Sequence, residues 1–490
     1  MDTGVIVVGA GPTGLMLACE LALAGVRTRV VEGRIEPQRD SRALSLHPRS
    51  VELMDQRGLL DRFLPLGRKV TGWHFGGLPT QLDFAALGAR HGYALFLAQA
   101  RTEAILAERA GELGVEISRG HEVRAVRQDA DGVEVEVRGP DDVAQTLRAG
   151  YVVGCDGGRS VVRAAAGIGF PGTDETLTGM LGDFAVVDAR PGELETARER
   201  GVLSVPLEGG STRFVLLDPE LLRVSSREPV TLEEFRAALV RRAGSDCGVG
   251  EPRWLSRFGN ATRLADRYRA GRVLLAGDAA HIHFPAAGQG LNTGLQDAMN
   301  LGWKLAATVN GWAPPGLLDT YEAERRPIGR ALIENTEIQT LLFELPLMER
   351  YRRPATALRT LLDELLGMEE VNRRLAGQVS ALGTVYPPTT PDADPLVGHR
   401  IPDADLPRGR LYPLLKKATF LLLTRPDTPA PPTDLPHLTT LTALHPALPD
   451  VTEILIRPDG HTAWATRTTT TKKRTEERAG ALREWVGVTS

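Results

Sequence analysis

Three glycines stand between an apolar strand and an apolar helical run at the start of the chain. The strand covers residues 5–8, the glycines are Gly9, Gly11 and Gly14, and a second apolar strand ends at Glu32. In such a turn the first glycine permits the bend, the second lets backbone approach a pyrophosphate, and the third lets the helix pack closely on the strand. The pattern predicts a β-α-β unit that binds an adenosine dinucleotide.

The acid at the end of the second strand limits which nucleotides this unit can bind. Glu32 lies eighteen residues after Gly14, where a carboxylate accepts hydrogen bonds from ribose hydroxyls and repels a 2′-phosphate. The helix N-terminus offers unpaired N–H groups and a partial positive charge to the phosphates. We therefore expect NAD or FAD, not NADP. The alternative, a chance glycine loop in a chain with 52 glycines, does not explain the strand, helix, strand and acid in register.

Composition and charge exclude several classes of protein. The 490 residues are enough for two or three domains. The net charge of -4 comes without a basic stripe, so no nucleic-acid partner is expected. No apolar run reaches the roughly 20 residues that span a membrane, and no signal peptide is visible, so we expect a cytoplasmic protein. Cys19, Cys155 and Cys247 lie far apart, which predicts neither a disulfide framework nor a metal site.

The order of elements predicts domains that are discontinuous in sequence. Short apolar segments at 183–187, 203–207 and 212–217 indicate an antiparallel sheet, whose apolar faces suit a flat ligand, although a plain core predicts the same pattern. A strand pair at 122–129 and 133–137 is expected to turn at Asp131-Gly132. The predicted domains are a nucleotide domain (1–70, 99–171 and 271–385), a middle domain (71–98 and 172–270) and, after a Pro-rich linker, a small α/β domain (396–490).

A second strand, glycine loop and helix follow the middle region. The strand from Arg272 leads to Gly277-Asp278, and a glycine-rich loop at 285–294 opens a helix. Two such units predict a ligand long enough to touch both. Taken alone, Asp278 is equally explained as a cap of the following helix and Asp156 as a turn residue. His281 is interpreted as a packed loop histidine, not a base.

Three motifs in this order resemble a known family. Gly9-x-Gly11-x-x-Gly14 with Glu32, then Cys155-Asp156-Gly157, then Gly277-Asp278-Ala-Ala-His281 resemble the single-component FAD-dependent aromatic hydroxylases of the para-hydroxybenzoate hydroxylase type. The resemblance covers residues 4 to about 380. The length and the tail look most like the hydroxylases of aromatic polyketides such as angucyclines and anthracyclines.

The resemblance implies an α/β architecture with a Rossmann-like FAD-binding domain, an inserted antiparallel-sheet substrate domain and a thioredoxin-like C-terminal domain. That last domain has no cysteine, which excludes thiol redox chemistry there and leaves packing or formation of a homodimer as its role.

The resemblance also assigns residues to the cofactor. It implies that the adenosine end of FAD is held by the first turn, that Asp278 binds the ribityl chain, and that a loop bordering the isoalloxazine uses backbone groups. Gln99 and Arg101 match a motif that also meets the flavin chain, Arg42 matches an arginine near the flavin and the nicotinamide, and Asp156 matches an acid linked to both cofactors. The turn residues are Gly9, Ala10, Gly11, Pro12, Thr13, Gly14 and Glu32, and the loop residues are Pro285, Gly288, Leu291 and Asn292.

Some assignments within this set are weaker. Arg159 and Arg163 are expected to pair with Asp156 or with phosphates. Where relatives often have arginine directly after the ribose-binding acid, this chain has Gly33 and then Arg34. No catalytic base is assigned, and only Arg42 and Pro285 are candidates close to the flavin.

The implied reaction is oxygenation of an aromatic ring. NADPH reduces FAD, O2 adds to give a C4a-hydroperoxide, and its distal oxygen is transferred to the substrate, a polycyclic aromatic molecule, in an apolar pocket that excludes water. The glycines at 288, 290 and 294 are expected to give clearance for a swinging flavin. The alternatives are Baeyer-Villiger oxygenation of a polyketide ketone, non-catalytic sequestration of a drug by a flavin-containing protein and, least supported, an NAD dehydrogenase.

Overall fold

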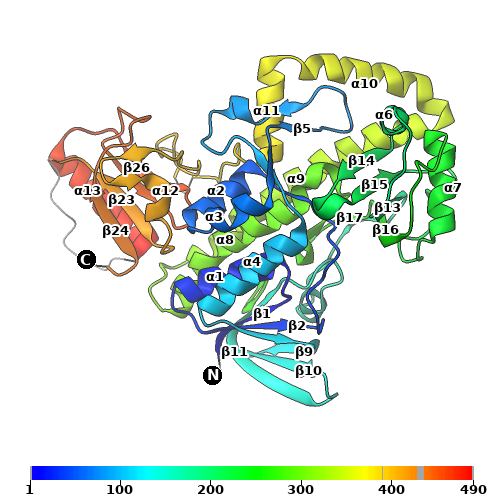
Figure 1. Cartoon of the computed structure of the whole chain (residues 1–490). Helices are drawn as coiled ribbons and strands as arrows, with labels where there is room; N and C mark the ends of the chain where they lie inside the picture. The colour runs from blue at the N-terminus through cyan, green and yellow to red at the C-terminus, as the bar shows by residue number, and fades with distance from the viewer. Residues whose placement is uncertain (1–2, 389, 427–434, 488–490) are drawn as a thin grey trace.

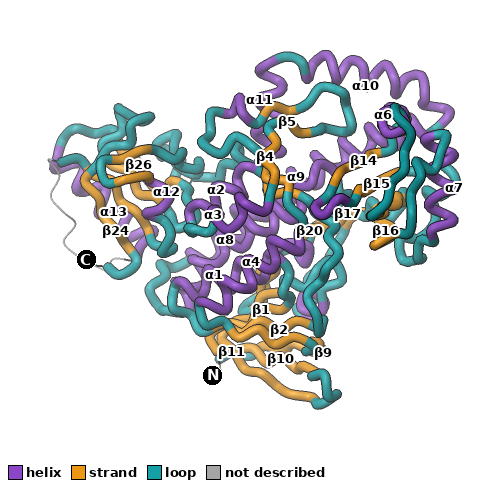
Figure 2. Tube along the Cα trace, viewed as in Figure 1, coloured by secondary structure: helices purple, strands orange, loops and turns teal. Residues whose placement is uncertain are grey.

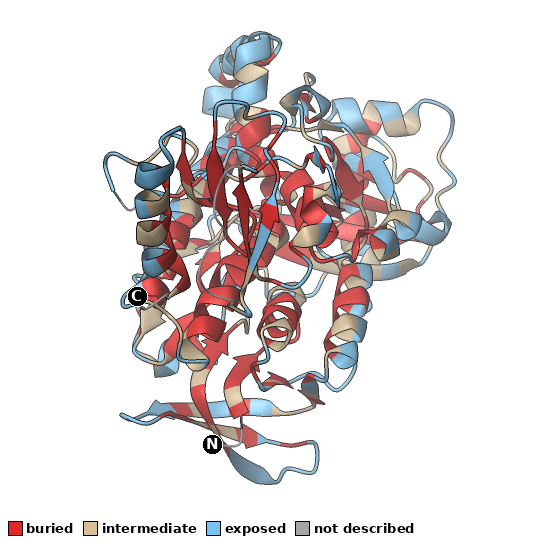
Figure 3. Cartoon of the chain, turned by 90° about the vertical axis from the view of Figure 1, so that its left-hand side faces the viewer, coloured by how far each residue is buried: buried red, intermediate tan, exposed pale blue. Residues whose placement is uncertain are grey.

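The computed structural model describes residues 3–388, 390–426 and 435–487. Figure 1 shows an α/β part around the N-terminus, an antiparallel sheet with its helices on the right, and a smaller α/β part that carries the C-terminus on the left. Figure 3 shows that the buried residues gather in the strands and on the inner faces of the helices. None of the described helices is both long enough and apolar enough to cross a membrane.

The first strand lies inside the largest sheet. β1 (Thr3–Val8) pairs in parallel with β2 (Thr28–Glu32) on one side and with β11 (Ala144–Gly154) on the other. Its unbroken apolar run fits a parallel strand that is buried on both faces. The order is β18-β19-β11-β1-β2-β8, with the hairpin β9–β10 joined to β11. The other strands are β8 (Glu116–Arg119), β9 (Glu122–Gln128), β10 (Val133–Arg138), β18 (Arg269–Ala270) and β19 (Val273–Leu275).

The helices beside the largest sheet pack closely against one another over the strands. α1 (Pro12–Leu23) contacts both α4 (Gln99–Glu112) and α8 (Gln289–Val309), and Figure 2 shows the three together above the strands. A Cβ at Gly302 would come within 2.5 Å of the Glu20 Cβ, so glycine lets α8 approach α1. Three shorter helices complete the part: α2 (Pro48–Gln56), α3 (Leu60–Phe63) and α5 (Val161–Ala165).

The antiparallel sheet of the middle region has the order β14-β15-β13-β16. Its strands are β13 (Thr178–Phe184), β14 (Leu203–Pro206), β15 (Thr212–Leu216) and β16 (Pro252–Gly259), and α6 (Glu193–Glu199) and α7 (Leu232–Ala243) pack on one face. The segment predicted as a strand at 183–187 is correct only for Asp183 and Phe184, the last residues of β13, where the pairing with β16 shifts register and the strand ends. Beyond it, Val187 makes only an isolated bridge to Val249.

The strands within residues 71–98 belong to two small sheets, one of which also includes strands from residues 45–70. β5 pairs with β6, and β7 pairs with β3 and β4. Within the described chain none of them pairs with the middle sheet, so the grouping of 71–98 with 172–270 stays a prediction. The short strands are β3 (Ser45–Leu46), β4 (Arg68–Val70), β5 (Gly72–Trp73), β6 (Leu82–Asp83), β7 (Ala94–Phe96), β12 (Gly172–Thr173), β17 (Thr262–Leu264) and β20 (His281–Ile282).

Three helices connect the larger parts. They are α9 (Thr320–Glu344), α10 (Arg352–Leu366) and α11 (Glu369–Ser380). Arg359 of α10 donates to the carbonyls of Gly76 and Gly77, at 3.0 and 2.6 Å, and Asp363 accepts from the Thr80 N–H at 2.7 Å. α10 is thereby tied to the loop between β5 and β6.

The C-terminal part is a four-stranded sheet with the order β24-β23-β25-β26. β23 runs parallel to β24 and antiparallel to β25. Its elements are β21 (Asp405–Leu406), β22 (Gly409–Arg410), α12 (Leu411–Leu414), β23 (Phe420–Thr424), β24 (Leu438–Thr442), β25 (Glu453–Ile456), β26 (Thr462–Thr466) and α13 (Thr471–Val486).

Buried ion pairs hold the C-terminal part against the rest of the molecule. Arg57 of α2's C-cap pairs with Glu20 at 2.6 Å and also donates to the carbonyls of Leu415 and Pro458 at 2.8 Å. Arg457, in the turn between β25 and β26, donates to both carboxylate oxygens of Glu324 on α9 at 2.8 Å. Buried charges persist only when paired and hydrogen-bonded, so these contacts fix how the parts dock.

Low pH should weaken the contact between the C-terminal part and the rest of the molecule, and so lower the free energy of unfolding. Burial tends to raise the pKa of Glu324, but Arg457 and Lys304 outweigh it and lower that pKa from 4.5 to about 2. Because the folded-state pKa lies below the unfolded one, the stabilisation is complete above pH 4.5 and is lost as the pH falls toward 2. Urea unfolding between pH 7 and pH 3 should show this loss in the wild type and less of it in Glu324→Gln. Equal losses in both would contradict the assignment.

Candidate cofactor site

The glycine turn leaves no room for side chains on its protein side. Gly9 has a φ of +105°, and a Cβ there would lie 2.3 Å from the Cys155 carbonyl oxygen. A Cβ at Gly14 would lie 2.0 Å from the Gly9 carbonyl oxygen. Gly11 differs, because a Cβ there meets no heavy atom within 4 Å. The turn is therefore packed at Gly9 and Gly14 and open at Gly11, where backbone would face a ligand.

A substitution at Gly11 should separate folding from cofactor binding. Gly11→Ala adds a methyl group into open space, so the free energy of unfolding of the apoprotein should stay within about 0.5 kcal/mol of wild type. If a pyrophosphate approaches there, FAD affinity should fall about tenfold, which corresponds to ~1.4 kcal/mol. Flavin fluorescence titration measures the affinity, and unchanged affinity would place the phosphates elsewhere.

Glu32 is attached to the same turn. One carboxylate oxygen accepts from the Ala10 N–H at 2.8 Å and the other from the Arg34 N–H at 2.9 Å. The side chain is largely buried and ends β2 beside the turn. The Arg34 side chain stays at 3.9 Å from the carboxylate and is mostly exposed. The acid is thus oriented by backbone N–H groups and keeps lone pairs for ribose hydroxyls.

Asp278 lies beside the glycine turn, in a short 3-10 turn after β19 (Gly277–Ala279). A Cβ at the preceding Gly277 would be 2.7 Å from the Thr13 hydroxyl, so the two turns touch. Asp278 is exposed and hydrogen-bonds to none of the described residues, yet surrounding protein raises the pKa of its carboxyl, against the opposing charges of His281 and Arg42. It caps no helix in the described chain, so the cap interpretation is wrong.

A buried acid that the sequence did not single out supports this turn. Asp297 of α8 accepts from the Gly277 N–H at 3.0 Å, lies 2.7 Å from the His281 Nε2 and accepts from the Arg325 Nε at 2.7 Å. Burial tends to raise the Asp297 pKa, but Arg325 and His281 hold it below its ordinary value. His281 is itself buried, in agreement with its interpretation as a packed histidine.

The loop before α8 is held by Asn292. Its side-chain oxygen accepts from the His47 N–H at 2.7 Å, and its nitrogen donates to the carbonyls of Ser45 and Gly288 at 3.1 and 2.8 Å. All polar atoms of the Asn292 side chain are therefore engaged within the protein, so this residue can offer only its backbone to a flavin ring. Pro285 is exposed and Leu291 is half-buried.

The prediction that Gly294 provides clearance for a moving flavin is wrong. A Cβ there would be 2.3 Å from the Thr13 hydroxyl, so this glycine serves the close packing of α8 on α1. A Cβ at Gly290 would lie 3.2 Å from the His283 Nε2, and one at Gly288, where φ is +68°, would lie 2.9 Å from the Ser45 hydroxyl.

Asp156 and its neighbours form the third motif. One Asp156 oxygen accepts from the Val161 and Val162 N–H groups at 2.8 and 3.2 Å, and the other is buried with no partner among the described residues. Burial raises the pKa of this carboxyl. The expected pairing of Arg163 with it is wrong, because Arg163 donates to the carbonyls of Ala279 and Gly158. Arg159 is exposed.

Three other predicted residues lie at the surface or within protein contacts. Gln99 donates to Glu103 at 2.7 Å, and Arg101 forms an exposed pair with Glu208 at 2.9 Å. The Arg42 side chain is exposed and contributes its charge near Asp278. Their contacts with a cofactor stay predictions.

An apolar surface borders the loop before α8. Phe284, directly before Pro285, packs its ring against Phe258 of β16 at 5.7 Å and against Phe343 of α9 at 6.2 Å. Half-buried Trp254 belongs to the same cluster, on the face of the middle sheet opposite α6 and α7. Phe258 and Phe284 are buried in this cluster, and Trp254 and Phe343 are the partly exposed aromatic rings at its edge.

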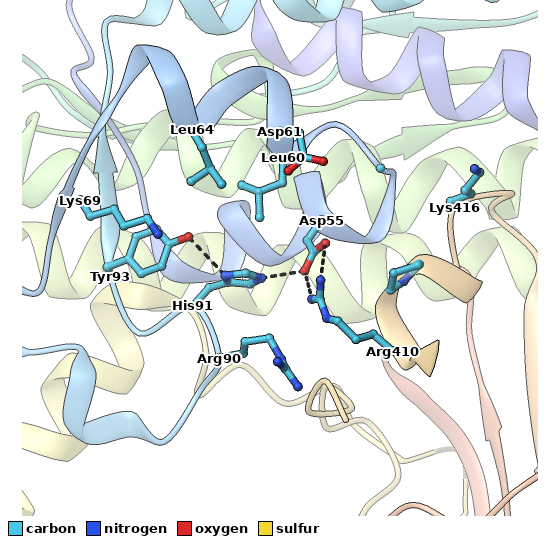
Figure 4. Close-up of a pocket in the computed structure, with 12 residues that line it drawn as sticks. Asp55, Leu60, Asp61, Leu64, Lys69, Arg90, His91, Tyr93, Arg410 and Lys416 are labelled. Atoms are coloured by element: carbon cyan, nitrogen blue, oxygen red, sulfur yellow. Dashed lines mark hydrogen bonds and ion pairs between the residues drawn. The ribbon is translucent and has the colours of Figure 1, made fainter. Parts of the chain in front are cut away.

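A separate cavity of about 470 Å³ lies at the seam with the C-terminal part. Figure 4 shows Tyr93, His91, Asp55 and Arg410 joined in one hydrogen-bonded line, with the Asp55 carboxylate 2.7 Å from the His91 Nε2. None of the residues predicted for the cofactor lines this cavity. It is therefore not the predicted cofactor site.

The residues present fit an extended dinucleotide such as FAD. The open side of Gly11, the exposed but unpaired carboxylate of Asp278 and the unpartnered oxygen of Asp156 belong to the three motifs. Thr13 against Gly277 and the Arg163 contact with Ala279 bring these motifs into one region. No cluster of three or more metal-ligating side chains occurs within the described ranges.

The chain is similar to known flavoproteins and aromatic-ring hydroxylases along nearly its whole length. Residues 2–336 match the FAD binding domain family, and residues 394–489 match the family of aromatic-ring hydroxylase C-terminal domains. The chain is 45% identical to 12-dehydrotetracycline 5-monooxygenase/anhydrotetracycline 6-monooxygenase of Streptomyces rimosus, over 99% of both chains. It is also 45% identical to rifampicin monooxygenase of Streptomyces venezuelae, over 94% of this chain and 95% of that protein. The solved structure of OxyS anhydrotetracycline hydroxylase from Streptomyces rimosus superposes with a TM-score of 0.87, at 43% identity over both full chains.

Proposed function

Because this chain belongs to the FAD-dependent aromatic-ring hydroxylases and is an aromatic monooxygenase, we propose that it hydroxylates a polycyclic aromatic polyketide with NADPH as reductant. The observation that carries the substrate class is the full-length likeness to an anhydrotetracycline hydroxylase. The apolar face around Phe258, Phe284 and Phe343 supports it, because stacked rings and excluded water suit a flat substrate.

The first motif, the third motif and the loop at 285–292 would hold FAD along its length. The N–H groups at the start of α1 would bind the pyrophosphate, Glu32 the adenosine ribose, Asp278 the ribityl hydroxyls, and backbone of 285–292 the ring. In this site FAD would supply the two-electron chemistry by which the nicotinamide reduces O2, with one oxygen atom transferred to the substrate and the other released as water. We assign to Arg42, exposed near Asp278, attraction of the negatively charged nicotinamide cofactor.

The chain's own residues then bind, orient and keep water away. Asp297 and Asn292 hold the Gly277 turn and the loop before α8 through buried hydrogen bonds. The apolar cluster around Phe284 would cover the ring end of the bound cofactor. Preorganised donors and a dry surface are what the protein contributes to such chemistry.

We also propose the domain arrangement of the sequence analysis, with a thioredoxin-like C-terminal domain. The parallel pair β23–β24, the antiparallel pair β23–β25 and α13 support that assignment. This domain lacks cysteine, so its role is structural. The proposal also includes formation of a homodimer through this domain.

Isotope labelling tests the function. The purified holoenzyme, NADPH, labelled O2 and a panel of aromatic polyketides should yield a product that gains one labelled oxygen as a ring hydroxyl, read by mass spectrometry. A lactone would instead indicate Baeyer-Villiger oxygenation. Tight binding of a polyketide without oxygen incorporation would indicate sequestration, and a colourless protein that takes up no FAD would overturn the proposal.

A further inference from the structure

Two consecutive residues of α9, Glu324 and Arg325, connect the C-terminal domain to the turn at Gly277-Asp278, called here the cofactor turn. Arg325 donates to Asp297 at 2.7 Å, and Asp297 accepts from the Gly277 N–H. Glu324 accepts both Arg457 donors at 2.8 Å. Because the two residues are neighbours on one helix, a shift of one moves the other.

The contact between Glu324 and Arg457 is buried, and the positive and negative charges around it are equal in number. Arg457 also donates to Asp459, in its own turn, at 2.5 and 3.1 Å. Glu324 further accepts from Lys304 at 2.7 Å and from Asn300 at 2.6 Å. Two cations and two carboxylates therefore balance in a region closed to water, where removing one partner leaves an uncompensated charge.

Tyr386 forms a second bridge between the same groups. Its hydroxyl accepts from Arg325 at 3.2 Å. Its ring lies 5.1 Å from the guanidinium carbon of Arg457 and 4.3 Å from the ring of His461, which follows in the same turn. Arg325 is thus held by Asp297 on the cofactor side and by Tyr386 on the C-terminal side.

We infer that Arg457 of the C-terminal domain is a positioning residue for the cofactor turn Gly277-Asp278. It pairs with Glu324, the chain neighbour of Arg325 on α9, and its guanidinium lies against the ring of Tyr386. The Tyr386 hydroxyl accepts from Arg325, and Arg325 donates to Asp297, which accepts from the Gly277 N–H. The domain without cysteines thereby completes the cofactor site although it contributes no residue to it. The inference rests on the proposed binding of FAD beside Asp278.

Arg457→Met in the full-length chain tests this inference. It keeps an unbranched apolar stem but removes the guanidinium group and its charge, so we expect the Kd for FAD to rise about tenfold, within the range for coupling along buried networks. At saturating FAD the visible circular dichroism of the bound flavin should also change, because the turn beneath it has moved. A loss of global stability alone would not alter that spectrum.

Arg57→Met is the matched control. Arg57 is equally buried, pairs with Glu20 and holds the Leu415 and Pro458 carbonyls of the same domain. It contacts α1 at the end far from the glycine turn and makes no hydrogen bond to α9 in the described chain. This variant should lower stability but keep the wild-type flavin spectrum at saturation.

A milder variant keeps the inference testable if Arg457→Met does not fold. Tyr386→Phe removes only the hydroxyl that Arg325 contacts, and the FAD Kd should rise about threefold. In the double variant the two effects should be less than multiplicative, because both act on Arg325. Wild-type affinity in both single variants, or the same spectral change in Arg57→Met, would overturn the inference. Failure of the wild type to bind FAD would instead overturn the proposed function.

Discussion

Exchanging Asp297 for asparagine should lower the free energy of unfolding by about 3–5 kcal/mol, the cost of breaking a buried ion pair. Asp297 and Arg325 are fully buried. The amide retains the shape but not the charge, so Arg325 is left uncompensated in the interior. The side-chain NH2 group of asparagine is a donor, and it would face another donor, either Arg325 or the Gly277 N–H, where the carboxylate accepted a hydrogen bond. Urea or thermal unfolding of the apoprotein measures the loss.

Glu337→Gln is the control for this charge removal. Glu337 is exposed on α9, and its side chain makes no hydrogen bond or ion pair with other described residues. Its substitution should change the free energy of unfolding by less than about 0.5 kcal/mol. If Asp297→Asn is equally harmless, Asp297 does not carry a charge in the folded protein, and its support of the Gly277 turn loses its basis.

Gly14→Ala is expected to abolish FAD binding and to lower the free energy of unfolding by about 3 kcal/mol, the upper end for overpacking. The new Cβ would lie 2.0 Å from the Gly9 carbonyl oxygen and 3.2 Å from the Cys155 Cβ. The first neighbour is backbone, which cannot move away as a flexible side chain does. α1 would have to shift from the sheet, taking with it the N–H groups that face the phosphates. The flavin content of the purified protein and its unfolding curve give both readouts.

Gly111→Ala is the matched helical substitution. A Cβ at Gly111 meets nothing within 4 Å and lies on the exposed side of α4. Alanine there should stabilise the helix by up to about 1 kcal/mol and leave FAD binding unchanged. Normal flavin content in Gly14→Ala would contradict the close packing of α1 on β1.

Local patterns predicted the parts of the fold that depend on neighbouring residues. The strand, glycine turn, helix and strand at 3–32 occur as expected, because the apolar run of β1 and the glycine spacing are local properties. The hairpin at 122–138 is also confirmed. The strand expected at 183–187 is confirmed only for Asp183 and Phe184, because the apolar run beyond Phe184 carries no information on where the partner strand β16 loses register.

The candidate site divides in the same way. Glycine spacing and acids at strand ends indicated Gly9, Gly14, Glu32 and Asp278. They did not indicate Asp297, whose partner Arg325 lies 28 residues away. No periodicity or motif marks a buried pair of that separation, since an acid and an arginine on two helices look like ordinary polar residues.

The sequence by itself determined the nucleotide-binding unit and the order of the three motifs, and it predicts an unphosphorylated ribose beside Glu32. These depend on backbone conformations that only glycine adopts and on acids placed at strand ends. Only the tertiary structure decided that Arg457, 133 residues from Glu324, reaches the helix that supports the cofactor turn. Such contacts form when the interior closes and each buried charge must find its partner, and that requirement acts in space, not along the chain.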